Sequence, residues 1–275
     1  MKKIIILIFS LNLVLISTNA QTLSKETVLI ETSYGKMKIK LFDETPLHKA
    51  NFLKLVNQNV FDSLLFHRVI NGFMIQGGDL ISKYAKPGDS LGHGDMGYSI
   101  PAEFNSKLIH KKGRLAAARE SDDINPKFES SASQFYIVMG KKRTLEDLKK
   151  YEERINKTHY TNCARGFMKT DEGKKLKSNY NRLKSENKLD SAELVNKEIE
   201  EQIKKEHLKT PEYKFNAEQI AAYTTIGGTP HLDGTYTVFG EVIEGMEVID
   251  KIASAKTDKR DRPIEDIRMK ITIMK

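Results

Sequence analysis

The sequence has 275 residues, of which 39% are hydrophobic, 8% aromatic and 30% charged, and its formal net charge is +8. This composition is typical of a folded protein of one or two domains, and it excludes wholesale disorder and collagen-like repeats. The single cysteine, Cys163, excludes a disulfide framework within the chain. The excess positive charge is concentrated near the N-terminus and in residues 141–222, so we expect no nucleic-acid partner.

The first 20 residues have the pattern of an export signal. Lys2 and Lys3 precede an apolar run over residues 4–16, and Ala20 ends a stretch of small or compact residues. This pattern predicts a signal peptide over residues 1–20 that is cleaved after Ala20. The alternative is an uncleaved membrane anchor, but the apolar run is short for a span of ~20 residues. We therefore expect an exported protein, periplasmic or extracellular, that is soluble after cleavage and has no stable membrane insertion.

The residues that follow predict a body made mainly of short strands. In the segment 36–41, Met37, Ile39 and Leu41 alternate with lysines, as in a half-buried strand. Asn71-Gly72 predicts a tight hairpin turn with positive φ angles. Many short strands and few helices favour a closed antiparallel barrel. The expected strands are 27–31, 36–41, 64–69, 73–76, 114–119, 134–139, 236–242 and 267–273, and the expected helices are 47–57, with Leu47, Ala50, Leu53 and Asn57 at helical spacing, and 246–253.

Residues 141–222 interrupt this body with a different composition. Of these 82 residues 35 are charged, and only two are glycine. Asp190 and Glu193 resemble a capping box before a helix that carries Val195, Ile199 and Ile203. The segment predicts two to four amphipathic helices inserted into a surface loop. Their basic side chains predict a solvated face, or alternatively a docking surface for client proteins, a partner or an anionic surface. One helical face would carry Leu145, Leu148, Tyr151 and Ile155.

Three blocks of sequence, in this order, resemble the signature of the cyclophilin family. Residues 66–79 read FHRVINGFMIQGGD, residues 133–137 read SQFYI, and residues 231–240 read HLDGTYTVFG. The resemblance covers residues 27–140 and 223–275 and leaves 141–222 as a charged helical insert. It implies a mainly β fold, a closed eight-stranded antiparallel cyclophilin-like barrel with two capping helices. It also implies peptidyl-prolyl cis-trans isomerase activity on proline-containing polypeptides. We expect a monomer.

The residues of these blocks suit that reaction. Rotation of a peptide bond meets a barrier of ~18–20 kcal/mol because the nitrogen lone pair is shared with the carbonyl. A hydrogen-bond donor aimed at the proline nitrogen would localise the lone pair as the bond twists, so neither a nucleophile nor a metal is needed. Arg68 carries a rigid fork of donors with a permanent charge, and the resemblance places it in this role with Gln76 beside it.

The resemblance assigns the remaining site residues. The proline pocket would be lined by Phe73, Met74, Tyr136 and Leu232, and Gln134 would lie beside Gln76. Tyr136 stands where phenylalanine is usual, His231 where tryptophan is usual, and Tyr236 where histidine is common. Ala118 and Arg119 would meet the peptide that precedes proline. Phe73 and Met74 are consecutive, so strand alternation alone would turn them to opposite faces.

Two further patterns favour plainer interpretations. Residues 92–97 match GxGxxG but neither follow a clear strand nor open a helix, which indicates a surface loop instead of a cofactor site. His159 and Cys163 are four residues apart on a possible helix, but no second pair completes a tetrahedral set, so we expect no metal site and no cofactor. Two classes of function stay open: an isomerase that assists the folding of exported proteins, and a binding module or chaperone with incidental isomerase activity.

Overall fold

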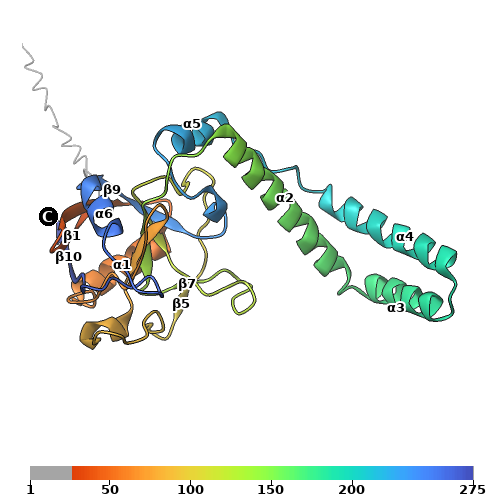
Figure 1. The fold of residues 1–275 in the computed structure, drawn as a ribbon, viewed down its shortest axis with the longest axis horizontal. Coiled ribbons are helices and arrows are strands. Elements are labelled where there is room, and N and C mark those ends of the chain that lie inside the picture. The colour runs from red at the N-terminus through yellow and green to blue at the C-terminus, as the bar shows by residue number, and fades with distance from the viewer. Residues whose placement is uncertain (1–26, 275) are drawn as a thin grey trace, which may run out of the picture.

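The computed structural model describes residues 27–274, which form ten strands and six α-helices (Figure 1). The predicted signal peptide lies outside the described residues. Between residues 27 and 274, no helix combines the length and the apolar character needed to cross a bilayer. The strands are β1 (Thr27–Thr32), β2 (Gly35–Leu41), β3 (Arg68–Ile70), β4 (Met74–Gly77), β5 (Ser99–Ile100), β6 (Arg114–Ala117), β7 (Ser130–Ser131), β8 (Phe135–Val138), β9 (Val238–Glu244) and β10 (Met269–Met274). The helices are α1 (Pro46–Asn57), α2 (Leu145–Phe167), α3 (Asp171–Ser185), α4 (Leu189–His207), α5 (Ala217–Thr225) and α6 (Met246–Ala253), with 3-10 turns η1 (Leu80–Tyr84) and η2 (Pro230–Leu232).

Eight strands form one antiparallel sheet in the order β10-β1-β2-β9-β6-β8-β4-β3. The two edge strands, β10 and β3, do not pair along a ladder. The segments that precede these two strands are joined by one isolated bridge between Leu65 and Arg268 and by hydrogen bonds such as Phe66 N to Ile267 O at 2.9 Å. The predicted closed barrel is therefore wrong, and the sheet is an open half-barrel. The reason is that β3 begins only at Arg68, so the residues before it contribute a bridge and no strand.

The core lies inside this curved sheet and under helices α1 and α6. The predicted alternation in β2 is confirmed, because Met37, Ile39 and Leu41 are buried. The predicted face of α1 is wrong: Leu47 is 50% exposed, and the helix instead buries four other side chains. The core packs five phenylalanine rings against one another at centroid distances of 5.0–6.3 Å, at Phe52, Phe61, Phe66, Phe135 and Phe239. The buried residues of α1 are His48, Phe52, Leu55 and Val56.

The hairpin between β3 and β4 turns over three residues, 71–73, and this turn determines the positions of two predicted site residues. Only Gly72 takes a positive φ, at 74°, and Phe73 N donates to Ile70 O at 3.0 Å. Phe73 therefore belongs to the turn, and the strand starts at Met74. Strand alternation does not apply across this boundary, so the two consecutive side chains can reach the same side of the sheet.

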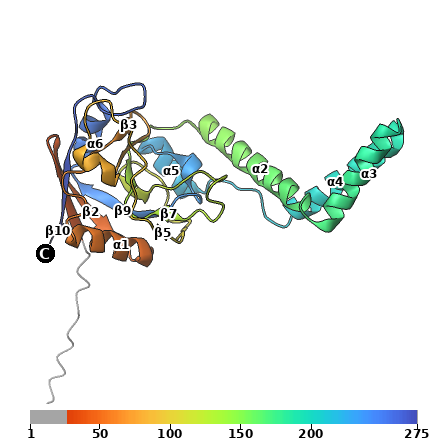
Figure 2. The same cartoon turned by 90° about the horizontal axis from the view of Figure 1, so that it is seen from below.

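The insert has a base that packs on the half-barrel and a distal arm that projects from it (Figures 1 and 2). At the base, Leu148 of α2 and Phe215 form a buried cluster with Ile109 and with Tyr223 of α5. We use the name distal arm for residues 158–211, which include the second half of α2, all of α3 and all of α4. In both views α3 and α4 run side by side at the far end of the molecule.

Two details of the insert differ from the expected sequence signals. The helix α4 has Lys188 as its N-cap, so Asp190 lies in the first turn and forms no capping box. Of the expected apolar face, Ile199 and Ile203 are buried and Val195 is only half-buried. The helix α5 spans residue 222, so the expected boundary of the insert falls inside a helix.

The structure indicates where the arm can be removed. Asn156 and Tyr213 exchange two hydrogen bonds, at 3.1 and 2.8 Å, so the chain on either side of the arm lies close together. Replacing residues 158–211 with a short Gly/Ser linker should leave the half-barrel folded, with a cooperative urea transition. Replacing 141–222 instead should lower stability markedly, because it removes Leu148 and Phe215 from the buried cluster and truncates α5. Equal stability of the two deletions would contradict this division of the insert.

Candidate active site

Arg68 and Gln76 face each other across the β3–β4 hairpin. The strand register pairs these two residues directly, and Arg68 Nη1 donates to Gln76 Oε1 at 3.5 Å. On its other side, Arg68 Nε lies 3.7 Å from Asp261 Oδ2, in an ion pair whose side chains are both about two-fifths exposed. The guanidinium is thus oriented from two sides and stays open to solvent, as a group that meets a ligand must be.

A cavity of about 160 Å³ opens beside this guanidinium. It is apolar toward its floor, where Met74, Tyr136 and Leu232 are buried, and polar at its rim. The structure therefore gathers nine of the eleven predicted site residues around one small hollow. Its lining comprises Arg68, Phe73, Met74, Gln76, Ala118, Arg119, Tyr136, Leu232 and Tyr236.

Beneath the cavity runs a buried polar chain that the sequence analysis missed. The Tyr136 hydroxyl lies 3.0 Å from His110 Nε2, and His110 Nδ1 lies 2.9 Å from Asp233 Oδ1. The second oxygen of Asp233 accepts a hydrogen bond from the hydroxyl of Tyr223 in α5. Burial raises the pKa of the Tyr136 phenol well above its ordinary value, so Tyr136 stays protonated. The hydroxyl that distinguishes Tyr136 from phenylalanine thus has a partner, and it links the pocket floor to the base of the insert.

The side chain of Arg119, which was expected to meet the peptide before proline, is held by contacts within the protein. Its guanidinium lies between the rings of Phe128 and Tyr236, at 4.7 and 4.4 Å from their centroids. It also donates to Thr235 O at 2.8 Å and pairs with Asp122 at 2.8 Å. Because the side chain is only 4% exposed, it braces the rim and offers little free charge to a ligand.

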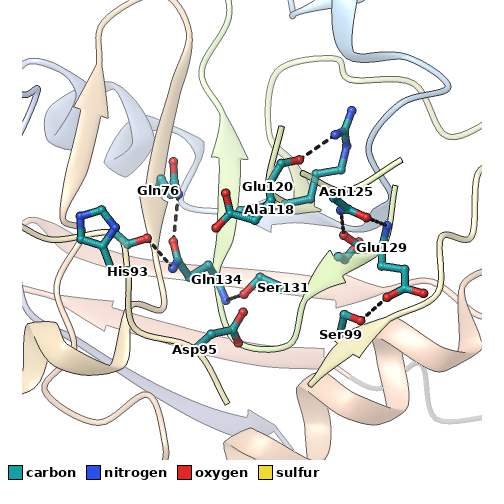
Figure 3. A pocket seen from close by; sticks show the side chains of 13 residues that line it. Gln76, His93, Asp95, Ser99, Ala118, Glu120, Asn125, Glu129, Ser131 and Gln134 are labelled. Carbon is teal, nitrogen blue, oxygen red and sulfur yellow. Dashed lines mark hydrogen bonds between the residues drawn. The ribbon is translucent and has the colours of Figure 1, made fainter. Parts of the chain in front are cut away.

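A second cavity, of about 300 Å³, adjoins the first (Figure 3). The two share Gln76, Ala118 and Arg119 in their linings. Figure 3 shows Gln76 and Gln134 pointing toward one another, and Gln76 Nε2 donates to Gln134 Oε1 at 3.2 Å. Gln134, which does not line the first cavity, therefore connects the guanidinium to the second one.

The wall of the second cavity is a glycine loop held by one buried carboxylate. Asp79, at 0% exposure, accepts hydrogen bonds from the backbone N–H groups of Gly92, at 2.5 Å, and Gly94, at 2.9 Å. The carbonyls of the same two glycines accept from Gln134 Nε2 at 3.0 and 3.1 Å. The GxGxxG segment is thus a surface loop, as expected, with a role in holding the glutamine of the site.

His231 does not line the first cavity but supports it from behind. Its ring stacks on Phe73 at a centroid distance of 5.7 Å and on Tyr151 of α2 at 5.8 Å. The guanidinium of Arg143 lies 5.5 Å from the Tyr151 ring on that side. Tyr151 lies on the apolar helical face that the sequence indicated, but the pattern gave no sign of which surface this face would contact. The insert thus contributes a ring to the stack that holds Phe73.

Two histidines near the site are held neutral. Burial lowers the pKa of His67 to about 4, with opposing effects of Asp79 and Arg68. Burial, followed by the charge of Arg143, lowers the pKa of His231 to about 4. His67, which is 4% exposed, is therefore suited to packing under the site and not to proton transfer at neutral pH.

These depressed pKa values predict a loss of stability in acid. The unfolded histidines take up protons near pH 6.5, whereas the folded ones do so only near pH 4. Stability should therefore be full above pH 6.5 and should fall between pH 6.5 and 4. His231→Phe keeps the ring stack and removes one of these groups, so the slope should become shallower by up to about 1.4 kcal/mol per pH unit. Urea unfolding at a series of pH values measures the slope; an unchanged slope in His231→Phe would contradict the assignment.

A profile described as cyclophilin type peptidyl-prolyl cis-trans isomerase/CLD matches residues 27–152 and 151–273. A putative bifunctional phosphatase/peptidyl-prolyl cis-trans isomerase of Streptococcus pyogenes is 30% identical over 244 residues, which cover 87% of this chain but 37% of that protein. A putative peptidyl-prolyl cis-trans isomerase of Staphylococcus haemolyticus is 28% identical over 257 residues, covering 91% of this chain and 94% of that protein.

Among solved structures, the fold is similar to a Cryptosporidium parvum cyclophilin type peptidyl-prolyl cis-trans isomerase that was crystallised in the presence of the dipeptide Ala-Pro. The TM-score is 0.50 at 21% identity, and the match covers 90% of this chain and 99% of that one. At this identity the likeness concerns the fold alone, while the profile extends over both parts of the half-barrel and into the insert. The chain belongs to the cyclophilin-type peptidyl-prolyl cis-trans isomerase family.

Proposed function

We propose that this protein uses Arg68 to catalyse rotation about X-Pro bonds in exported polypeptides and so assists their folding. The observation that carries the proposal is the position of Arg68, held between Gln76 and Asp261 at the edge of a small apolar cavity. The cavity holds a proline ring while the guanidinium donates toward the ring nitrogen. The donor then acts more strongly on the twisted bond than on the planar one, which is the condition for catalysis.

The pocket needs an apolar floor as well as a donor. Met74 and Leu232 bury the ring of proline and exclude water, so the donor acts in surroundings of low polarity. Tyr136 adds a ring whose hydroxyl is already bonded to His110, so no unpaired polar group faces the substrate. The residues that hold the proline ring in place are thus separate from Arg68, the donor that lowers the barrier to rotation of the peptide bond.

The residue before proline extends toward the second cavity. Ala118 and Gln76 belong to both linings, so a chain that leaves the first cavity passes them on its way into the second. The second cavity has carboxylates at its edge, including Glu120 and Glu129. The Cryptosporidium relative crystallised with Ala-Pro supports a proline-containing substrate for this site.

The proposal that the protein is exported is based on the N-terminal pattern of Lys2, Lys3 and the apolar run after them. Cleavage after Ala20 should give a mature protein that starts at Gln21. Expression of the full chain in a bacterial host, followed by mass measurement of the exported form, tests this. A product that keeps residues 1–20 and stays with the cells would contradict the export part of the proposal and leave the catalytic part standing.

Arg68→Ala should lower kcat/KM for a proline-containing peptide by at least about tenfold, equivalent to about 1.4 kcal/mol of transition-state stabilisation. Arg68→Lys should recover little, because an ammonium lacks the flat fork that Gln76 and Asp261 orient. Arg260→Ala is the matched control, since it removes another exposed arginine from the neighbouring loop and should keep full activity. Unchanged turnover in a folded Arg68→Ala protein would contradict the role of Arg68 in catalysis.

The stack behind Phe73 gives a prediction about the insert. Tyr151→Ala removes the ring that holds His231 against Phe73, so the pocket wall should loosen and kcat/KM should fall by roughly three- to tenfold, corresponding to the ~0.5–1.5 kcal/mol typical of an aromatic pair. Tyr151→Phe keeps the ring and should retain activity. A protease-free isomerisation assay on a short peptide measures both, and equal activity of Tyr151→Ala and the native protein would show that the insert does not shape the pocket.

A further inference from the structure

The distal arm brings together three metal-ligating side chains that are far apart in the sequence. His159 and Cys163 lie one turn apart on α2, and His207 is the last residue of α4. One ligand atom from each lies within 4.8 Å of the other two. The sequence offered only the first two, because the third is 48 residues away from His159 and joins them only through the packing of α4 on α2.

The geometry of the three side chains is close to that of a shared ion. His159 Nδ1 lies 2.8 Å from His207 Nδ1, and Cys163 Sγ lies 3.8 Å from His159 Nε2. A tetrahedral zinc ion, with nitrogen ligands at ~2.0–2.1 Å and sulfur at ~2.3 Å, separates pairs of its ligands by about 3.3–3.7 Å. The two short contacts use different ring nitrogens of His159, and one ion would engage only one of them. With a single ligand atom from each residue, all three separations are within 4.8 Å, so side-chain shifts of about 1 Å bring the three atoms close to tetrahedral spacing. All three are half-buried, and the edge of Tyr160 covers His207 at a centroid distance of 5.4 Å.

The distal arm has few buried side chains, so a metal ion that links its helices would add to its stability. Among the residues of α2, only Leu148 is buried, and it lies at the base of the insert. The helix α4 buries Ala192, Ile199 and Ile203, whereas the second half of α2 buries no side chain. A bond that ties α2 to the end of α4 closes a long loop that includes all of α3, and such closures stabilise a small unit with a weak core.

We propose that His159, Cys163 and His207 bind a divalent transition metal ion of zinc type, which fastens α4 to α2 and rigidifies the distal arm. Two imidazoles and one thiolate suit zinc better than calcium or magnesium, which prefer oxygen ligands. The fourth position is left to water or to a side chain of a bound polypeptide. The site lies in the arm, so it is separate from the Arg68 cavity, and its test does not depend on isomerase activity.

Cobalt substitution tests the site directly, because Cys163 is the single cysteine of the chain. Titration of the reduced, purified protein with Co²⁺ should produce a sulfur-to-cobalt charge-transfer band that saturates at one ion per chain and is displaced by Zn²⁺. His159→Gln and His207→Gln should each weaken binding by at least about tenfold. His93→Gln, which alters an exposed histidine of the glycine loop, is the matched control and should bind as the native protein does.

A second measurement distinguishes a metal site formed by all three side chains from metal binding by Cys163 alone. Zn²⁺ should slow backbone amide exchange in the second half of α2 and in α4 of the native protein, but not in Cys163→Ser, whose zinc affinity measured by calorimetry should fall as well. The proposal is overturned if no charge-transfer band forms, if the band survives unchanged in both His159→Gln and His207→Gln, or if His93→Gln loses binding to the same extent. It is also overturned if zinc binds without any change in exchange of the arm.

Discussion

The cross-strand pair of Arg68 and Gln76 is the contact on which the rest of the site depends. It exists because a three-residue turn at 71–73 fixes the register of β3 on β4. The same turn keeps Phe73 outside the strand while Met74 begins it, so both reach one cavity. A shift of register by a single residue would turn Arg68 away from Gln76 and send the pocket side chains to the opposite face of the sheet.

The site is supported from below and from behind by buried hydrogen bonds and ring contacts. Below the pocket, Tyr136, His110 and Asp233 form a hydrogen-bonded chain in which each buried polar atom has a partner, as low polarity demands. Behind the pocket, His231 lies between two aromatic rings. Both supports reach helices of the insert, through Tyr223 near the end of α5, which crosses the boundary of the insert, and through Tyr151 of α2.

The insert therefore consists of two parts, a base and a distal arm, that differ in their packing. Its base shares a buried cluster with Ile109 of the half-barrel and completes the supports of the pocket. Its distal arm is rich in charged side chains of both signs, buries little apolar surface along α2 and projects away from the half-barrel. Such an arm gains rigidity mainly from links between its helices, which is where the cluster of His159, Cys163 and His207 lies.

The sequence by itself determined the family, most of the strands and helices, and the residues around the Arg68 cavity, because these follow from local alternation and from three dense blocks of side chains. The tertiary structure decided the rest. Tyr151 meets His231, and His207 meets His159, only because helical residues 48 or more positions apart along the chain pack together in one way. The open edge between β3 and β10 likewise depends on where pairing stops, which no residue pattern marks. Local patterns specify faces and periods, whereas the partner of each face is set by packing over the whole chain.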